Sequence, residues 1–184
     1  QNFGMSRTTL PFIKETMKHQ CVSLDCYPYT AGSTMIRVDR GMLDARVLIA
    51  SSDPHPEMAG RDLKDIAAEW GVNGAEAAQR LQPGSAIYFL MDERDVERIL
   101  AHPRTMVGSD GLPFDPHPHP RQWGTFTRVL SRLVRDKGLL TLEAAVYKMT
   151  GLAAANYGLR DRGLLQPGLR ADLVVFDPQR VTDL

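Results

Sequence analysis

Apolar and polar positions along the chain follow two different periods. Helices are expected where apolar residues recur at roughly every third or fourth position, and strands where they alternate or form a short continuous run. This pattern predicts helices over residues 7–19, 61–70, 74–81, 93–100, 124–137, 142–149 and 153–159. It predicts strands over residues 20–27, 46–50, 86–91, 105–109 and 173–176. Strands that alternate with helices are typical of a parallel sheet, so we expect an α/β fold.

Two loops are the predicted location of a functional site. In parallel α/β folds, reactive side chains lie on loops that follow the carboxyl ends of strands. Residues 27–34 end the first predicted strand, and residues 108–121 follow the fourth. Both segments contain proline and glycine, which interrupt regular structure, and both carry polar or aromatic side chains.

The composition excludes several classes of protein. Lysine and arginine number 22, as do aspartate and glutamate, so the formal net charge is zero. A nucleic-acid-binding domain or a polybasic membrane anchor would normally carry a basic excess. No apolar run reaches the ~20 residues needed to cross a bilayer. With 43% hydrophobic and 24% charged residues, we expect a globular chain without a nucleic-acid or membrane partner.

Asp110 is the candidate for acid–base chemistry. It follows a short strand and lies between Gly108 and Gly111, residues that allow positive φ angles and close approach of other groups. A carboxylate at such a place can bind a metal ion and take a proton from metal-bound water. The structural alternative is an Asx turn, or an N-cap of the next helix.

Two tyrosines and two arginines are candidates for binding a carboxylate. Tyr27 and Tyr29 flank a proline at the end of the first strand, where a hydroxyl can hydrogen-bond an anionic group or a ring can simply pack the loop. Arg37 and Arg40 follow shortly afterwards. A guanidinium binds a carboxylate through two parallel hydrogen bonds, and the alternative role is a solvated surface charge.

Histidine and cysteine offer weaker signals. His117 and His119 form an HxH pair, a spacing that can chelate zinc on a strand, but each precedes a proline in a loop. We therefore expect no HxH metal site there, although His119 could still contact a substrate or a second carboxylate. Cys26 is either a metal ligand or a buried thiol, and the buried thiol is the more common role.

Several motifs occur together in a specific order. Residues 25–34 read DCYPYTAGST, and residues 108–111 read GSDG. Residues 119–130 contain HPR, GTF and RVL, residues 148–150 read KMT, and residues 162–177 contain RG and ADLVVFD. This series resembles the N-acyl-D-amino-acid deacylases, or D-aminoacylases, of the metal-dependent amidohydrolase superfamily. The resemblance runs over essentially the whole chain.

The resemblance implies a TIM-like (β/α)8 barrel and a small β-sandwich domain built from both ends of the chain. We expect residues 1–165 to form the last strands and helices of the barrel, with a helical insertion at about 57–82. Residues 166–184 would return to the sandwich. Gln1 is not an initiator methionine, and Leu184 follows closely on an apolar run. We therefore expect the C-terminal part of a longer protein.

The resemblance also implies a centre of one or two zinc ions. The family binds metal through an HxH pair, a cysteine, two further histidines and an aspartate, and Asp110 is the counterpart of that aspartate. The remaining ligands are expected upstream of Gln1. Asp110 would then be a metal ligand and would take the proton from the attacking water. Tyr27 and Arg40 would bind the carboxylate of the substrate.

These expectations describe part of a zinc-dependent hydrolase that cleaves N-acyl-D-amino acids to a carboxylate and a D-amino acid. Its partners would be that small-molecule substrate and the missing N-terminal part of the same protein, and we expect a cytoplasmic location. Two alternatives stay open. One is a non-catalytic fragment that needs the missing half, and the other is a dihydroorotase- or hydantoinase-like enzyme acting on cyclic amides.

Overall fold

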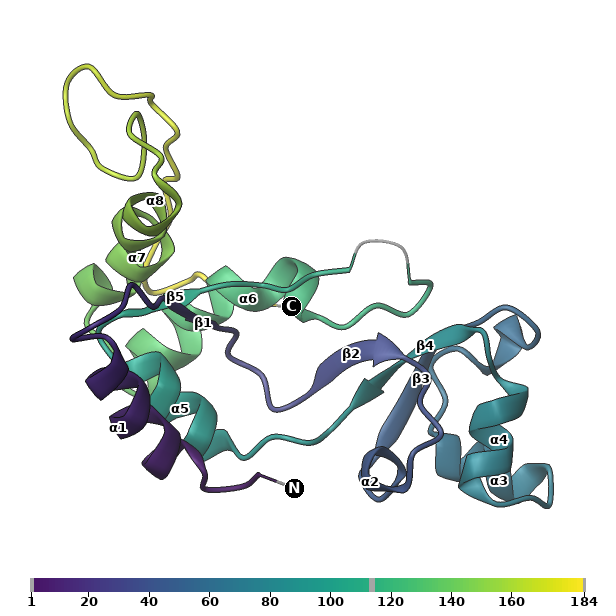
Figure 1. Ribbon diagram of the computed structural model, residues 1–184. Coiled ribbons are helices and arrows are strands. Elements are labelled where there is room, and N and C mark those ends of the chain that lie inside the picture. Colours follow the sequence, from purple (N-terminus) through teal and green to yellow (C-terminus); the bar gives the residue numbers. More distant parts are fainter. Residues whose placement is uncertain (1, 113–114, 184) are drawn as a thin grey trace. The chain divides into compact units, whose positions relative to one another are not determined.

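The computed structural model describes residues 2–112 and 115–183, with the side chain of Arg40 left out. The chain forms two compact units (Figure 1). The first, here the antiparallel unit, consists mainly of Tyr29–Asp92 and Gly111–Gln122. The second, here the parallel unit, consists of Gly4–Pro28, Glu93–Asp110 and the chain from Trp123 onward. Among the described residues, no helix is long and apolar enough to span a membrane.

The antiparallel unit is a three-stranded sheet with helices packed on it. The strands β2 (Gly32–Met35), β3 (Val47–Ser52) and β4 (Gly84–Tyr88) pair in the order β2-β4-β3. The helices are α2 (Arg40–Leu43), η1 (Pro56–Met58), α3 (Leu63–Glu69) and α4 (Gly74–Arg80). The helix α4 begins where Asn73 accepts a hydrogen bond from the Glu76 backbone N–H at 2.9 Å. The core joins the sheet to α3 and α4 and includes Ile49, Ile66, Ala77, Leu81 and Ala86.

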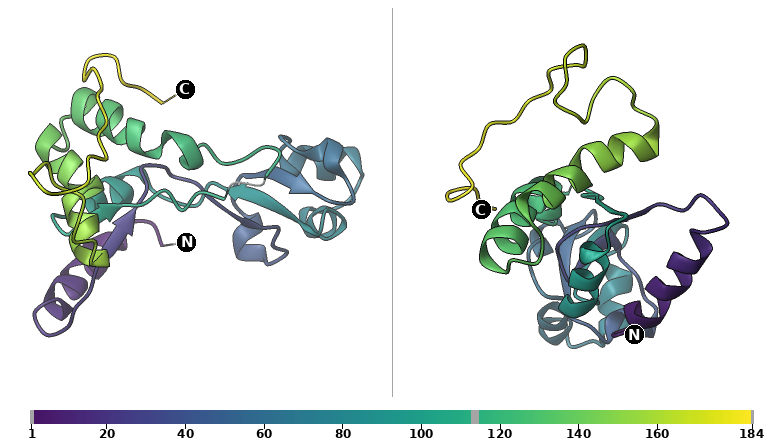
Figure 2. Two further views of the ribbon diagram at one scale, coloured as in Figure 1. Left: turned by 90° about the horizontal axis from the view of Figure 1, so that it is seen from above. Right: turned by 90° about the vertical axis from the view of Figure 1, so that its left-hand side faces the viewer.

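The parallel unit contains two short parallel strands surrounded by helices. Strand β1 (Leu24–Cys26) pairs with β5 (Thr105–Val107), and Cys26 lies opposite Val107. The helices are α1 (Ser6–Thr16), α5 (Glu93–Ala101), α6 (Arg121–Arg128), η2 (Val129–Asp136), α7 (Leu142–Met149) and α8 (Gly151–Tyr157). All three residues of β5 are buried, as expected for a strand covered on both faces. After α8 the chain runs out as a long loop and returns towards η2 (Figure 2).

Most predicted elements are confirmed, and four of them differ in the structure of this chain. The strands near residues 46–50 and 86–91 are antiparallel neighbours, and β2 begins inside the loop predicted over residues 27–34. The predicted helix 124–137 starts earlier, at Arg121, and its second half, η2, is a π-helix. Residues 173–176 form no strand within the described chain, because a strand needs a neighbour to satisfy its backbone groups. Instead Val174 and Val175 are 85% and 99% exposed.

Candidate functional site

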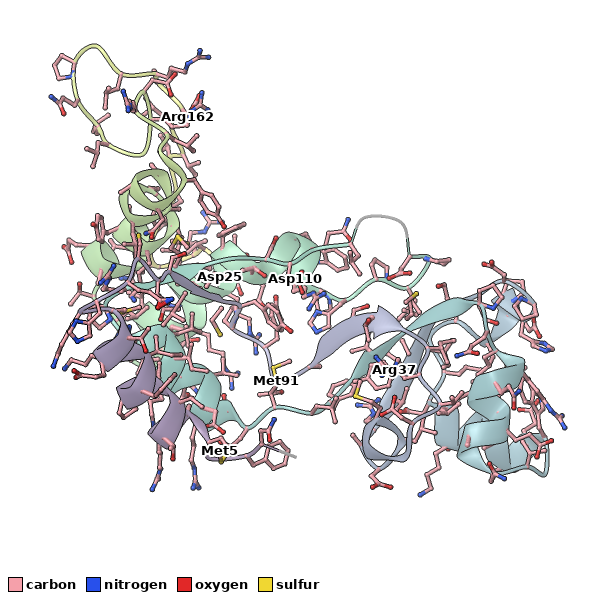
Figure 3. The ribbon with its side chains drawn as sticks, in the orientation of Figure 1. Met5, Asp25, Arg37, Met91, Asp110 and Arg162 are labelled. Carbon is pink, nitrogen blue, oxygen red and sulfur yellow. The ribbon has the colours of Figure 1, made fainter. Side chains whose placement is uncertain are left out.

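Tyr27 and Asp110 lie at the same edge of the parallel strand pair. The chain leaves β1 through Cys26 into Tyr27, and it leaves β5 through Val107 towards Asp110. Because β1 and β5 are parallel with Cys26 opposite Val107, both exits are at the carboxyl edge. Figure 3 shows Asp110 beyond the end of β5 and Asp25 on β1. The structure therefore brings two of the three predicted site residues to one edge within one unit.

Asp110 has an exposed side chain and a left-handed backbone, with φ of 48°. Asp and Asn tolerate this conformation better than other non-glycine residues, because their short polar side chains bond locally. A side chain on Gly108 would place its Cβ 2.7 Å from Oδ2 of Asp25, so the glycine permits the close approach of that carboxylate. The next helix, α6, begins only at Arg121, so Asp110 is not its N-cap.

Hydrogen bonds restrain the backbone between Tyr27 and the end of strand β1. The Gly108 N–H donates to the Cys26 carbonyl at 3.3 Å, which extends the parallel ladder beyond the last paired residues. The Cys26 thiol donates to the Tyr27 carbonyl at 3.4 Å. Burial, with a smaller contribution from the charge of Asp25, raises the pKa of this thiol to about 12. Without a metal ion, Cys26 therefore stays protonated at neutral pH, and its side chain is partly buried.

His119 is a buried histidine that joins the two predicted functional loops within the antiparallel unit. Its Nδ1 accepts a hydrogen bond from the Arg121 backbone N–H at 3.0 Å, so the proton resides on Nε2. Nε2 then donates to the Ala31 carbonyl at 3.0 Å. Burial, followed by the charge of Arg121, lowers the pKa of His119 to about 4, while the bond to Ala31 opposes this effect. The imidazole is therefore neutral, with both nitrogens bonded to backbone.

Its neighbour His117 has a different environment. His117 is exposed, its ring lies against Gly60, and its backbone N–H donates to the Ala50 carbonyl at 3.1 Å. The two histidines therefore do not form a metal-binding pair. Within residues 2–112 and 115–183, no group of three or more His, Cys, Asp or Glu side chains is placed to hold a metal ion.

Tyr29 and Arg121 complete the contact between the two loops. The Tyr29 hydroxyl donates to the Pro120 carbonyl at 3.4 Å, and its ring meets His119 edge to face at 5.2 Å. Tyr29 thus packs the loop, which is one of the two roles predicted for it. Arg121 is only 2% exposed, and its guanidinium donates to the Ser33 carbonyl at 3.3 Å. The sequence reasoning missed this residue, although the HPR motif was a signal for it.

The predicted arginines lie elsewhere in the antiparallel unit. Arg37 is exposed, and its Nε is 3.0 Å from Oδ2 of Asp39, which is the surface role considered for it. Arg40 is the first residue of α2, and its side chain lies outside the described structure. An open hollow in this unit is lined by residues 43–47 and 62–65, together with parts of α3 and α4.

The fold defines the structural class of the chain, and the comparison with known families defines its family. The fold, with its parallel and antiparallel strands among helices, is of the α/β class. The model of the amidohydrolase family matches residues 31–183, and the chain belongs to that family. The predicted resemblance is thereby confirmed.

Three relatives are similar over the whole chain. N-acyl-D-aspartate deacylase of Alcaligenes xylosoxydans xylosoxydans is 59% identical, over 100% of this chain and 37% of its own length. A solved D-aminoacylase, described with a binuclear metal centre, is 59% identical with a TM-score of 0.96, over 99% of this chain and 38% of that one.

The third relative is a solved N-acyl-D-glutamate deacylase of Bordetella bronchiseptica, complexed with zinc and a phosphonate inhibitor. It is 52% identical with a TM-score of 0.96, over 100% of this chain and 39% of that one. The chain thus spans less than two fifths of the length of each relative.

Proposed function

We propose that the full-length protein to which this chain belongs hydrolyses the amide bond of N-acyl-D-amino acids. The observation that carries the proposal is the chain-wide identity of 59% to an N-acyl-D-aspartate deacylase, with 52% to an N-acyl-D-glutamate deacylase. An identity this high over the whole chain includes the segments from which the functional loops are built. The products would be a carboxylate and a D-amino acid.

The proposed architecture has three parts. Residues 1–165 would supply the last strands and helices of a (β/α)8 barrel, with an insertion at about 57–82, and residues 166–184 would return to a small β-sandwich. The parallel pair β1–β5 with its surrounding helices supports the barrel. The insertion region contains η1, α3 and α4, and all three belong to the antiparallel unit. The exposed apolar residues Leu173, Val174 and Val175 support the sandwich strand, since such residues are normally buried in a sheet.

Asp110 is the proposed proton-transfer residue. It would take a proton from the attacking water and return it to the leaving amine, a contribution of about 10²–10⁴-fold to the rate. Its exposed position beyond the carboxyl end of β5 is suited to this role. Zinc sites generally need about four donors, and the described residues contain no group of three or more His, Cys, Asp or Glu side chains placed to supply them. We place the other ligands of one or two zinc ions in the part of the protein that lies outside this chain.

Tyr27 and Arg40 are the proposed partners of the substrate carboxylate. A carboxylate that leaves water needs charged or hydrogen-bonding partners, because burying an unpaired charge is costly. Tyr27 supports the proposal by its place at the same edge as Asp110, whereas Arg40 rests on the family resemblance alone. By fixing the carboxylate they would supply one of the contacts that distinguish the D-amino acid from its mirror image.

The proposal is tested by assaying the purified full-length protein with zinc. N-acetyl derivatives of D-aspartate, D-glutamate and a neutral D-amino acid are compared with their L-forms. We expect hydrolysis of at least one D-substrate and little of any L-substrate. Hydrolysis of hydantoin or dihydroorotate in its place would favour the cyclic-amide alternative, and no hydrolysis of any of them would overturn the proposal.

The carboxylate partners are tested by comparing each acid with its matching amide. Arg40→Ala in the full-length enzyme should weaken use of the acid by on the order of 2–4 kcal/mol, because a charged hydrogen bond is lost. Use of the D-amino-acid amide should fall far less. An unchanged preference for the acid over the amide would remove Arg40 from the proposed site, and Arg37 would be the next position to test.

A further inference from the structure

Arg128 connects two segments of the parallel unit that are far apart in sequence. Its Nε donates to the Pro28 carbonyl at 2.9 Å, and its Nη1 is 2.9 Å from Oδ2 of Asp183. The ion pair is partly shielded, with side-chain exposures of 24% and 20%. Hydrogen bonds from a charged donor are stronger than neutral ones, and partial burial limits their screening by solvent.

Pro28 directly follows Tyr27, so the hydrogen bond from Arg128 acts next to the proposed substrate contact. The proline ring limits both its own φ and the backbone of the preceding Tyr27. On the other side of Tyr27, the Gly108 N–H holds the Cys26 carbonyl at 3.3 Å. Hydrogen bonds therefore restrain the backbone on both sides of Tyr27. The strand ladder holds the preceding residue, Cys26, and the guanidinium of Arg128 holds the following residue, Pro28.

Arg128 itself stands at a place where the helix changes type. It is the last residue of α6 and the N-cap of the π-helix η2. π-Helical turns are rare in proteins, and those that occur are often found at functional sites. The same helix binds the C-terminal segment at further points. Arg135 donates to the carbonyls of Gln179 and Val181 at 3.4 and 2.7 Å. These contacts place Asp183 where it can hold the guanidinium of Arg128.

We propose that Arg128 is a positioning residue for substrate recognition, oriented by Asp183. It fixes the Pro28 carbonyl and thereby the direction in which Tyr27 presents its hydroxyl to the substrate carboxylate. This inference rests on the proposed role of Tyr27. It adds that the C-terminal segment contributes to recognition although it does not touch the substrate.

The test uses the full-length zinc enzyme and compares an N-acyl-D-amino acid with the matching amide. In Arg128→Lys the single ammonium cannot hold both the Pro28 carbonyl and Asp183 in the geometry of the guanidinium. We expect the KM for the acid to rise about tenfold, the loss of one charged hydrogen bond. We expect kcat and the KM for the amide to change by no more than about twofold, because transition-state contacts are untouched.

Two further variants distinguish the proposed positioning role from a simple folding defect. Asp183→Asn keeps the shape of the partner while removing its charge, and we expect the same loss of acid preference to a smaller degree. The matched control is Arg132→Lys, the same chemical change on the same helix, where the partner is Glu93 and Pro28 is not involved. A similar shift in all three variants, or equal losses for acid and amide, would overturn the proposal.

Tyr27→Phe separates this inference from the function on which it rests. If Tyr27→Phe leaves the acid preference unchanged, the proposed role of Tyr27 fails and the inference fails with it. If Tyr27→Phe reduces the preference while Arg128→Lys and Asp183→Asn do not, only the inference fails. If Tyr27→Phe and Arg128→Lys each reduce the acid preference, the double variant should lose less of that preference than the sum of the two single losses. The reason is that both residues act through the same contact with the substrate carboxylate.

Discussion

At the residue scale, His119 shows how one buried side chain joins two loops. One ring nitrogen bonds to the Ala31 carbonyl of the loop 27–34, and the other bonds to the Arg121 N–H of the loop 108–121. Both loops were predicted to carry functional residues. Each bond requires a different state of the nitrogen, so the geometry selects the neutral imidazole with its proton on Nε2. A protonated ring would have a donor facing the Arg121 N–H, and that contact would be repulsive.

The lowered pKa of His119 predicts a dependence of stability on pH. The pKa is about 4 in the folded chain and 6.5 in the unfolded one, so between these values the unfolded state binds more protons. The contribution of His119 to stability, about 3 kcal/mol in all, is fully present above pH 6.5 and is lost as pH falls towards 4.

Urea unfolding between pH 4 and 8 measures this effect of His119. His119→Gln keeps a donor for the Ala31 carbonyl but cannot titrate, so its stability should fall less over the same range. His117→Gln changes the exposed neighbour and serves as the control. Equal pH dependence in parent and His119→Gln would show that another group is responsible.

Asp110→Asn in the full-length enzyme should preserve the fold and remove most of the turnover. Asn tolerates the left-handed backbone as well as Asp does, so Tm should be nearly unchanged. The rate should fall by about 10²–10⁴-fold, because the proton acceptor is lost. Thermal melts and kcat of the two proteins check both parts, and a kcat near that of the parent would remove Asp110 from the mechanism.

At the element scale, the strands differ in what specifies them. β5 has only three residues, yet all are buried and it is recognisable as an apolar run before a glycine. β2 reads GSTM, and half of it is exposed, so no pattern in it indicates a strand. It forms because its backbone completes the antiparallel ladder with β4.

Gly84 at the start of β4 illustrates how closely β3 and β4 approach each other. A Cβ at this position would lie 2.3 Å from the Ser51 carbonyl oxygen and 2.9 Å from the Ser52 Cα. Both are backbone atoms that cannot move independently, so Gly84→Ala should lower the free energy of unfolding by about 2–4 kcal/mol.

The matched control is Gly74→Ala, at the first residue of α4, where no atom lies within 4 Å of the added Cβ. This change should be neutral or stabilising by up to about 1 kcal/mol. Urea unfolding of the two variants gives the comparison. A loss at Gly84 no larger than that at Gly74 would contradict the steric argument.

At the scale of the whole molecule, the C-terminal loop keeps apolar side chains in water. Ion pairs of Asp161 with Arg162 and Arg170 order the loop, yet Leu173, Val174 and Val175 remain exposed. Such a run is costly to leave uncovered and prone to associate. This agrees with the proposal that residues 166–184 complete a sheet with a part of the protein outside this chain.

Val175→Asp tests that proposal. Because Val175 is 99% exposed, the substitution should change the unfolding free energy of this chain by less than about 0.5 kcal/mol. In the full-length protein the same charge would be buried in the sandwich, so the yield of folded enzyme and its Tm should fall clearly. Gln179→Asp, on the same segment, is the control. A full-length Val175→Asp protein as stable as the parent would argue against a sandwich strand at this position.

The predictable part of the candidate site lies in motifs and turns. Asp110 could be found because it follows a short apolar strand and stands between two glycines, and Tyr27 because it ends another strand. Arg121, His119 and Arg128 could not be assigned in the same way. Their environments arise from backbone carbonyls of distant segments, and a carbonyl has no signature in sequence.

Periodicity and turn residues act over a few neighbours, so the sequence alone specifies most of the helices, the buried strands and the carboxylate that follows β5. Tertiary packing sets the antiparallel pairing of β2, β3 and β4 and keeps the imidazole of His119 neutral. It also placed Arg128 against Pro28. The contacts of His119 and Arg128 span 88 and 100 positions of the chain. Such pairings are set by the packing of whole elements and by which backbone groups must be satisfied on burial.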